Sequence, residues 1–238
     1  MPRMSQVVMV AAIIVGVAAL AALAYWHLVL AEGVYLGRRV VVWLYDRSAA
    51  SYDRIKDFDP DDDADYLGRP LAEQLAGQSD ARVLDVATGT GRLPLTLLSQ
   101  PEFQGSVVAL DASREMLAQA EAKLAAYGER VTLVHHSASP LPFADAHFDA
   151  VTCIEALEFL PNPDLALREM VRVLRPGGTL LVSPRVGIDR LYFPGRAPGL
   201  STYNARLAAL GLRNIETRTW QTYYSLVWAT RDGVEGAY

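Results

Sequence analysis

Two aspartates and a glycine-rich turn are spaced so that they could bind a polar ligand. Asp85 is followed by Gly89 and Gly91, which allow a sharp turn and a close approach of the backbone to a ligand at the start of a helix. Asp111 lies 20 positions after Gly91. A carboxylate at that position can accept hydrogen bonds from both hydroxyl groups of a ribose.

These groups favour a ligand that carries no phosphate. The charge of Asp85 would repel a pyrophosphate but would attract the ammonium group of an amino acid. Ala112 and Met116 could flank a flat purine, although Met116 could equally belong to the core. A ligand with an ammonium group, a ribose and an aromatic base is expected, and S-adenosylmethionine fits. Pro94 stands at the third glycine position of a dinucleotide-binding turn, which argues against an NAD-dependent oxidoreductase.

From Ala81 onward, short apolar runs alternate with helical patterns, which is typical of βαβ units around a parallel sheet. Strands are predicted over 82–86, 106–110, 131–135, 148–153 and 179–183, helices over 92–99, 113–127 and 163–174, and a hairpin over 213–219 and 223–230. Ligands of such sheets bind at the carboxyl ends of the strands. Because Asp85 and Asp111 each end a predicted strand, they are expected at the same edge of the sheet.

Four segments of this region resemble the class I S-adenosylmethionine-dependent methyltransferases, in particular their type 11 group. They are VLDVATGTGR, VVALDASREMLAQA, LPFADAHFDAVTC and LREMVRVLRPGGTLLVSPR, in this order between about 82 and 185. The resemblance implies an α/β fold with a Rossmann-like, doubly wound, seven-stranded sheet whose last strand is antiparallel. It also implies a methyltransferase that uses S-adenosylmethionine as its cofactor.

The same resemblance implies which residues hold the cofactor. The methionyl part would lie against Asp85 and the 87–91 turn, the ribose against Asp111, and the adenine beside Ser137 and Ala138. The full expected set is Asp85, Ala87, Thr88, Gly89, Thr90, Gly91, Asp111, Ala112, Met116, Ser137, Ala138 and Ile154. Relatives commonly have aspartate in place of Ser137, whose hydroxyl is a weaker acceptor for the adenine amino group.

Methyl transfer from a sulfonium is an in-line displacement, in which the protein chiefly aligns the nucleophile and excludes water. A carbon or phenolic nucleophile must also lose a proton, so a base is useful. The sequence does not assign a catalytic residue. The candidates for a base are Glu155, Glu158, His135, His136 and Tyr52, and each of them could instead be structural.

The 7–30 segment contains no Asp, Glu, Lys or Arg, and as a helix of about 24 residues it exceeds the roughly 30 Å of hydrocarbon in a bilayer. Tyr25 and Trp26 suit an interfacial aromatic belt. We therefore expect a single-pass anchor over 1–31, with the remaining chain on the cytoplasmic side, where the cofactor is. A cleaved signal peptide is the alternative, because Ala22-Leu23-Ala24 offers a cleavage site.

Residues 32–80 are expected to form an interfacial and helical cap ahead of the methyltransferase domain at 81–238. The 40–45 run is too short to span a bilayer and could lie along its surface. The triplet Tyr-Asp-Arg occurs twice, starting at Tyr45 and at Tyr52, and this spacing would place both tyrosines on one face of a helix. They could cover a ligand pocket or simply pack the helix on the domain.

An acidic run after Asp57 looks at first like a metal loop. It does not match a calcium loop, because Asp62 stands where that turn needs glycine. Asp59 is instead expected to cap a helix that has Pro60 in its first turn. No metal site is expected elsewhere either, and the lone Cys153 excludes an internal disulfide.

The formal net charge is −5, and the chain lacks the excess of basic residues that a nucleic-acid binder needs, so no nucleic-acid partner is expected.

The YDRSAASYDRIKD segment is similar to the opening of the ubiquinone/menaquinone-biosynthesis C-methyltransferases, which implies a lipophilic acceptor such as a quinone precursor. The EALEFL segment from Glu155 departs from that subfamily. A phospholipid or another small molecule remains an alternative acceptor, and a non-catalytic, cofactor-binding scaffold an alternative function. The oligomeric state is not predicted.

A loop after the fifth predicted strand contains Arg185, Arg190 and Arg196 together with Tyr192 and Phe193. These side chains could bind an anionic head group at a bilayer surface. They could equally be ordinary residues of a solvated loop.

Overall fold

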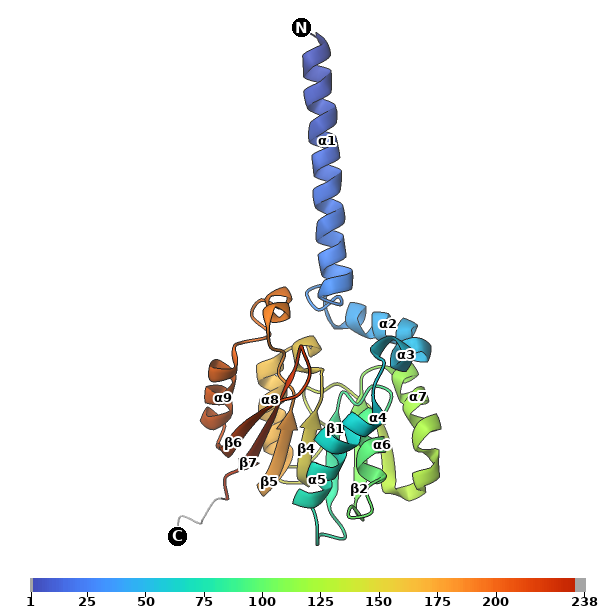
Figure 1. Cartoon of the computed structure of the whole chain (residues 1–238), viewed down its shortest axis with the longest axis vertical. Helices are drawn as coiled ribbons and strands as arrows, with labels where there is room; N and C mark the ends of the chain where they lie inside the picture. Colours follow the sequence, from blue (N-terminus) through green and yellow to red (C-terminus); the bar gives the residue numbers. More distant parts are fainter. Residues whose placement is uncertain (1, 234–238) are drawn as a thin grey trace.

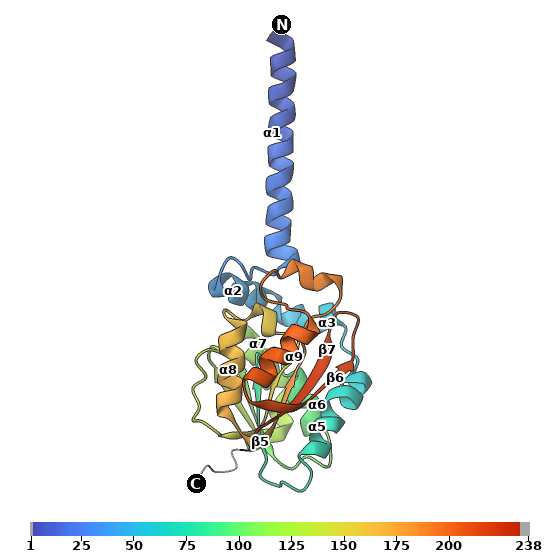
Figure 2. The same ribbon diagram turned by 90° about the vertical axis from the view of Figure 1, so that its left-hand side faces the viewer.

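The chain consists of a long N-terminal helix and an α/β domain in this computed structural model, which describes residues 2–233, with side chains from residue 6 onward. The helix α1 (Pro2–Tyr25) continues into a wider helical segment, η1 (Trp26–Leu30), and projects away from the domain (Figures 1 and 2). The Gln6–Leu30 stretch is long and apolar enough to cross a membrane, and none of it is buried. A signal sequence has the same properties.

The domain is built on one seven-stranded sheet in the order β3-β2-β1-β4-β5-β7-β6. The strands are β1 (Arg82–Val86), β2 (Ser106–Asp111), β3 (Val131–His135), β4 (Phe148–Cys153), β5 (Leu174–Val182), β6 (Leu212–Thr219) and β7 (Ser225–Arg231). Strands β1 to β5 are parallel, and β7 lies antiparallel between β5 and β6. The predicted fold class, including the antiparallel last strand, is therefore confirmed.

Helices pack on both faces of the sheet, because successive strand residues point to opposite faces. Leu84 belongs to a buried cluster with α8 and α9, whereas its neighbour Val83 belongs to a second cluster with α5, α6 and α7. The helices are α5 (Arg69–Gln74), α6 (Arg92–Leu98), α7 (Arg114–Leu124), α8 (Pro163–Val173) and α9 (Leu200–Ala209), with short helical turns η4 (Ala125–Arg130), η5 (Leu157–Phe159) and η6 (Ile188–Tyr192).

The start of β5 differs from the prediction. The strand begins at Leu174 rather than at 179, and the residues between them bulge, since Phe148 pairs with Leu174 while Ala150 pairs with Thr179. A Cβ atom on Gly178 would lie 2.8 Å from the Asp149 carbonyl oxygen, so glycine allows this close passage. Helix α9 is a further difference, because it was not predicted.

Short helices connect α1 to the sheet, and those that come first in the chain lie over the carboxyl ends of its strands (Figure 1). They are α2 (Arg38–Ser48), η2 (Ala49–Ser51), α3 (Tyr52–Lys56), α4 (Pro60–Asp63) and η3 (Ala64–Gly68), and we call the 38–68 segment the cap. The predicted helix start is confirmed: the Asp59 side chain accepts hydrogen bonds from the backbone N–H groups of Asp61 and Asp62. Tyr45 and Tyr52, in contrast, lie in two successive helices rather than in one.

Candidate functional site

A cavity lies between the cap and the carboxyl ends of β1, β2 and β4. Together with the solvent at its mouth it encloses about 740 Å³. We call it the large cavity; its lining includes Arg38, Val41, Val42, Tyr45, Tyr52, Ala87, Gly89, Asp111, Ala112, His136, Ser137, Ala138, Ile154, Glu155, Phe159 and Leu160. A small recess of about 420 Å³ adjoins it and is lined by Asp85, Thr88, Thr90, Phe58 and Arg92 among others.

The glycine-rich turn forms the boundary between the two hollows. Ala87 has a φ of +58° and Gly89 a φ of +56°, so both adopt the left-handed conformation that costs an L side chain energy. Gly91 begins α6, where a Cβ atom would lie 3.1 Å from the Cβ atom of Ala120. The turn thus combines backbone strain next to the cavities with close packing of α6 on α7.

Asp111 closes the turn from the neighbouring strand. One carboxylate oxygen accepts from the backbone N–H of Gly89 at 2.8 Å, and the other accepts from the backbone N–H of Ser113 at 2.8 Å. Burial raises the pKa of this carboxyl, and those two N–H groups oppose the rise. Because each carboxylate oxygen has more than one lone pair, both can still accept a hydroxyl hydrogen from the cavity.

Asp85 lies at the bottom of the small recess and is 2% exposed. One of its oxygens accepts from the Thr152 hydroxyl at 2.6 Å. Burial raises the pKa of Asp85 to about 7, and the hydrogen bond from Thr152 limits the rise. A cationic group in the recess would stabilise the charged carboxylate.

Most of the predicted cofactor residues lie together. Ala112, Ser137 and Ala138 line the large cavity, and Thr88 and Thr90 line the small recess. Of the predicted residues that the structure describes, Gly91 and Met116 line neither hollow. Met116 is 1% exposed in the core, and its backbone N–H donates to the Ser113 hydroxyl, so it supports the wall from behind. The position of Met116 beside a purine is therefore not supported.

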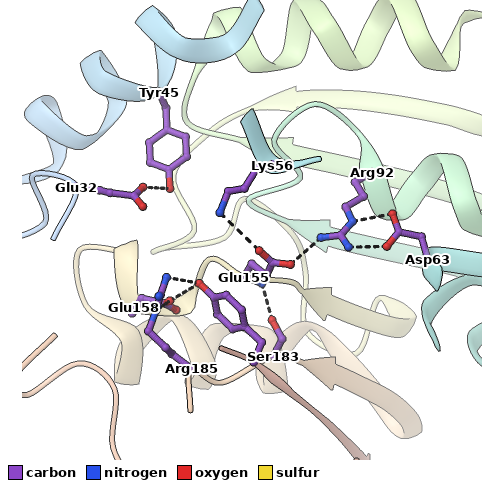
Figure 3. Close-up of polar contacts among 10 residues, drawn as sticks. Glu32, Tyr45, Lys56, Asp63, Arg92, Glu155, Glu158, Ser183 and Arg185 are labelled. Atoms are coloured by element: carbon purple, nitrogen blue, oxygen red, sulfur yellow. Dashed lines mark hydrogen bonds and ion pairs between the residues drawn. The ribbon is translucent and has the colours of Figure 1, made fainter. Parts of the chain in front are cut away.

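Glu155 is the candidate base with the most charged partners. It follows β4 with a φ of +52°, and its carboxylate pairs with Arg92 at 2.7 Å and with Lys56 at 3.6 Å (Figure 3). Arg92 pairs in addition with Asp63 of α4. Glu155 therefore joins the large cavity to the cap through a chain of ion pairs.

The other candidate bases divide into two groups. His136 and Tyr52 line the large cavity, and burial raises the pKa of the Tyr52 hydroxyl. Glu158 lies behind the wall, 2% exposed, and accepts from Arg185 and from Tyr224, each at 2.7 Å (Figure 3). His135 is exposed, and its ring lies 3.0 Å from the Ala112 carbonyl oxygen. Neither Glu158 nor His135 lines either hollow.

The repeated Tyr-Asp-Arg triplet has a role that the sequence did not reveal. Both tyrosines line the large cavity, with ring centroids 5.9 Å apart. Asp46 accepts from the Ser113 hydroxyl and Asp53 accepts from the Thr90 hydroxyl, each at 2.5 Å. Asp53 also pairs with Lys123 of α7. The two triplets therefore fasten the cap to the loops that follow β1 and β2.

Glu32 is a second feature that the sequence did not reveal. It adopts a left-handed conformation with a φ of +47°, and its carboxylate accepts from the Tyr45 hydroxyl at 2.8 Å (Figure 3). Burial raises the pKa of Tyr45 well above its ordinary value, and the neighbouring Glu32 charge adds to the rise. A lone glutamate after an apolar run carries no pattern from which this contact could be predicted.

The loop after β5 uses two of its arginines inside the protein. Arg185 pairs with Glu158, and Arg196 donates to the carbonyl oxygens of Glu158, Leu160 and Pro161. Their expected contact with a head group is therefore not supported. Arg190 remains without an ion-pair partner among the described residues.

Comparison with known proteins gives one matching family and many relatives. Residues 83–178 match a family described as a methyltransferase domain. The ubiquinone/menaquinone biosynthesis C-methyltransferase UbiE of Hahella chejuensis is 36% identical over 144 residues, which cover 60% of this chain and 58% of the relative. The demethylmenaquinone methyltransferase of Lactiplantibacillus plantarum is 35% identical over 140 residues, covering 58% and 59% respectively. The chain thus spans less than three fifths of the length of these relatives.

Solved structures share the fold at lower sequence identity. The S-adenosylmethionine-dependent methyltransferase of Aquifex aeolicus is 22% identical, with a TM-score of 0.56, and the alignment covers 73% of this chain and 98% of that one. This likeness shows that the α/β domain shares its fold with that protein.

Proposed function

We propose that this chain, which carries a class I S-adenosylmethionine-dependent methyltransferase domain, transfers a methyl group to a lipophilic small molecule. The composition of the large cavity supports this most directly. Asp111, Ser137 and Ala138 provide polar and small groups on one side. On the other side, α2 and the connection after β4 provide apolar side chains, among them Val41 and Phe159. An acceptor with a substantial apolar surface fits between them.

S-adenosylmethionine is the cofactor, and the residues present fit it. The buried Asp85 suits the ammonium group, and the free lone pairs of Asp111 suit the two ribose hydroxyls. His136, Ser137 and Ala138 leave room for the adenine beside β3. When bound, the cofactor supplies an electrophilic methyl group.

The contribution of the protein is alignment and exclusion of water. Tyr45 and Tyr52 cover the cavity from the cap, and Tyr52, with its raised pKa, stays protonated and can donate a hydrogen bond to an oxygen of the acceptor. His136 and Glu155 also lie on the wall and can accept a proton from a carbon or phenolic nucleophile.

A quinone precursor is the acceptor class that the relatives favour, since their names refer to quinone biosynthesis. An anionic lipid such as a phospholipid is a second candidate. Arg38 favours it, because this cation lies on the cavity wall next to the apolar Val41 and Val42. Both acceptors carry a large apolar part, and the two differ in the charge of the group that reaches Arg38.

The proposal includes the division of the chain. Residues 1–31 form a single-pass membrane anchor, 32–80 an interfacial and helical segment that contains the cap, and 81–238 the methyltransferase domain, which lies on the cytoplasmic side. The exposed apolar surface of Gln6–Leu30 supports an anchor. The position of the cap, between this helix and the large cavity, supports entry of the acceptor from the membrane (Figure 1).

The test is incubation of the purified full chain with methyl-labelled S-adenosylmethionine and a host lipid extract, followed by identification of the labelled product. Label in a quinone-type or phospholipid product is expected. The Asp111→Ala variant is the matched control, which should transfer little label. Label only in water-soluble products would contradict a lipophilic acceptor. Cofactor binding without any transfer would instead support a non-catalytic scaffold.

A further inference from the structure

The outer face of α2 has a composition that the methyltransferase site does not explain. Val41, Val42 and Tyr45 face the large cavity. On the opposite side Arg39, Trp43 and Arg47 follow at four-residue intervals, which places them on one face of the helix. All three are exposed, Trp43 by 59%.

Neither outer arginine is bound within the protein. Among the described residues, Arg39 and Arg47 make no side-chain hydrogen bond and no ion pair. Tryptophan and arginine are characteristic of helices that lie in a membrane interface, where the ring enters the head-group layer and the guanidinium meets anionic lipid. The composition therefore fits a bilayer surface.

A second exposed group lies in η6. Ile188 is 76% exposed and Leu191 is 61% exposed, with Arg190 between them. The turn is nevertheless held firmly, because the adjacent Phe193 is 1% exposed and packs edge-on against Phe159. Apolar side chains that a well-anchored loop holds in the solvent indicate an interaction surface.

Both groups lie at the end of the domain from which α1 emerges. Figures 1 and 2 show α2 and η6 on either side of the base of α1. The 31–37 segment, which we call the joint, packs on the domain. Ala31 and Val34 share a buried cluster with Phe159 and Phe193. The Tyr35 hydroxyl donates to the Pro194 carbonyl oxygen at 2.9 Å. These contacts fix the base of α1 next to both groups.

We propose that Arg39, Trp43, Arg47, Ile188, Arg190 and Leu191 form a docking face that enters the head-group layer of an anionic bilayer beside the anchor. The inference rests on the proposed role of α1 as an anchor and adds a second attachment of the domain. Continuity with α1 favours a lipid surface as the occupant. Charge complementarity supports it, since three arginines stand against one acid in η6, Asp189.

The docking face would bring the large cavity to the lipid. Val41, Val42 and Tyr45, on the inner side of α2, line the cavity. Arg38 contributes to both the cavity wall and the exposed surface. An apolar acceptor could then pass from the bilayer to the cofactor site without crossing bulk water.

The test uses the full chain in vesicles of phosphatidylcholine with about a third phosphatidylglycerol, a content that gives an anionic surface. A polarity-sensitive label is attached to single cysteines in a Cys153→Ala background: Leu191→Cys in the docking face, Val17→Cys in α1, and Gln78→Cys at the opposite end of the sheet. Quenching by lipids that carry a nitroxide near the head group is expected for Leu191→Cys, and little is expected for Gln78→Cys.

The label in α1 separates the two proposals. A quencher deep in the acyl chains should quench Val17→Cys whether or not the domain docks. Quenching at Val17→Cys without quenching at Leu191→Cys would overturn the docking face and leave the anchor intact. No quenching at Val17→Cys would instead count against the anchor and the docking face together. Protection of Leu191→Cys from aqueous quenchers without lipid quenching would indicate a protein partner and would also overturn the proposal.

Charge reversal provides the second arm. The triple variant Arg39→Glu, Arg47→Glu, Arg190→Glu should lower the lipid quenching at Leu191→Cys by about twofold or more, because repulsion replaces attraction to the anionic lipid. Arg69→Glu, on α5 away from the face, is the control and should leave the quenching unchanged. Equal quenching in the triple variant and the parent chain would contradict the electrostatic part of the docking face.

Discussion

Asp85 and Asp111 are both carboxylates at the ends of neighbouring parallel strands, yet their surroundings prepare them for different tasks. Asp111 accepts hydrogen bonds from the backbone N–H groups of Gly89 and Ser113, which holds the turn in place. Its carboxylate still has lone pairs that can accept from neutral hydroxyls. Asp85 accepts from the Thr152 hydroxyl and meets little solvent, so a positive charge in the recess would satisfy it best.

Replacement of Asp111 by alanine removes the tie to Gly89 and the proposed acceptors of both ribose hydroxyls. Cofactor affinity should fall by about 1–3 kcal/mol for each charge-assisted hydrogen bond that is lost. Titration calorimetry with S-adenosylmethionine measures the change, and thermal melting shows whether the variant remains folded. An unchanged Kd in a folded variant would contradict the placement of the ribose at Asp111.

Cofactor affinity should depend on pH through Asp85. The pKa of this carboxyl is about 7 in the folded protein and 3.8 ordinarily, so between these values the folded state holds an additional proton. The contribution of Asp85 to the free energy of unfolding is therefore greatest at low pH and is lost as the pH rises through about 7. An ammonium group needs the charged form, so the affinity for S-adenosylmethionine should rise from pH 6 to 7.5, by at most about tenfold per unit.

The Asp85→Asn variant is the control for this effect. It cannot titrate, so its affinity should be weaker at pH 7.5 and nearly flat over the same interval. A parent chain whose Kd is independent of pH would show that Asp85 does not meet the ammonium group.

At the scale of the elements, the cap is tied to the loops that follow β1 and β2 by side chains that lie far apart in the sequence. Asp46 and Ser113 are separated by 67 positions, and Asp53 and Thr90 by 37. These contacts exist only once the cap lies over the sheet. Cofactor binding and closure of the cap should therefore support each other.

The double variant Asp46→Asn, Asp53→Asn tests this coupling. Loss of the charged acceptors should weaken each tie by about 1 kcal/mol, lower cofactor affinity, and expose the trypsin sites at Arg54 and Lys56. Limited proteolysis with and without cofactor measures the exposure. Asp57→Asn is the matched control, because Asp57 has a φ of +49°, which asparagine tolerates, and its side chain makes no hydrogen bond among the described residues.

The strands could be predicted from the sequence because each is a local apolar run that ends at a turn residue. The ranges predicted for β1, β3 and β4 match the structure, and the strand ends placed Asp85 and Asp111 at one edge. The cap contacts could not be predicted, since a Tyr-Asp-Arg repeat specifies a helix face and not the hydroxyl that an aspartate reaches. The same holds for Glu32, whose partner Tyr45 is set by the path of the joint.

At the scale of the whole molecule, the N-terminal helical segment and the domain are joined by residues that pack on the domain. From Gln6 onward, α1 contains no buried residue, whereas Trp26 stacks on Tyr35 and Ala31 is fully buried. The end of the exposed apolar stretch and the start of the folded domain therefore overlap, since Trp26 belongs to the first and also packs on the domain.

Two truncations should behave differently for this reason. Removal of residues 2–25 should give a folded domain whose cofactor affinity equals that of the full chain, because no described side chain of α1 lines either hollow. Removal of residues 2–31 should also take away the packing of Trp26 and Ala31 and lower the free energy of unfolding by roughly 1–3 kcal/mol. Denaturant titration compares the two; equal stabilities would show that the joint does not support the domain.

Only seven residues, 31–37, separate η1 from α2. With α1 in a bilayer, a tether this short would confine the catalytic centre to a thin layer above the lipid. The protein would then meet an acceptor that is dissolved in the bilayer by lateral diffusion in two dimensions. The turnover rate would follow the mole fraction of acceptor in the lipid rather than its amount per volume, so dilution with inert lipid would slow the enzyme while dilution with buffer would not.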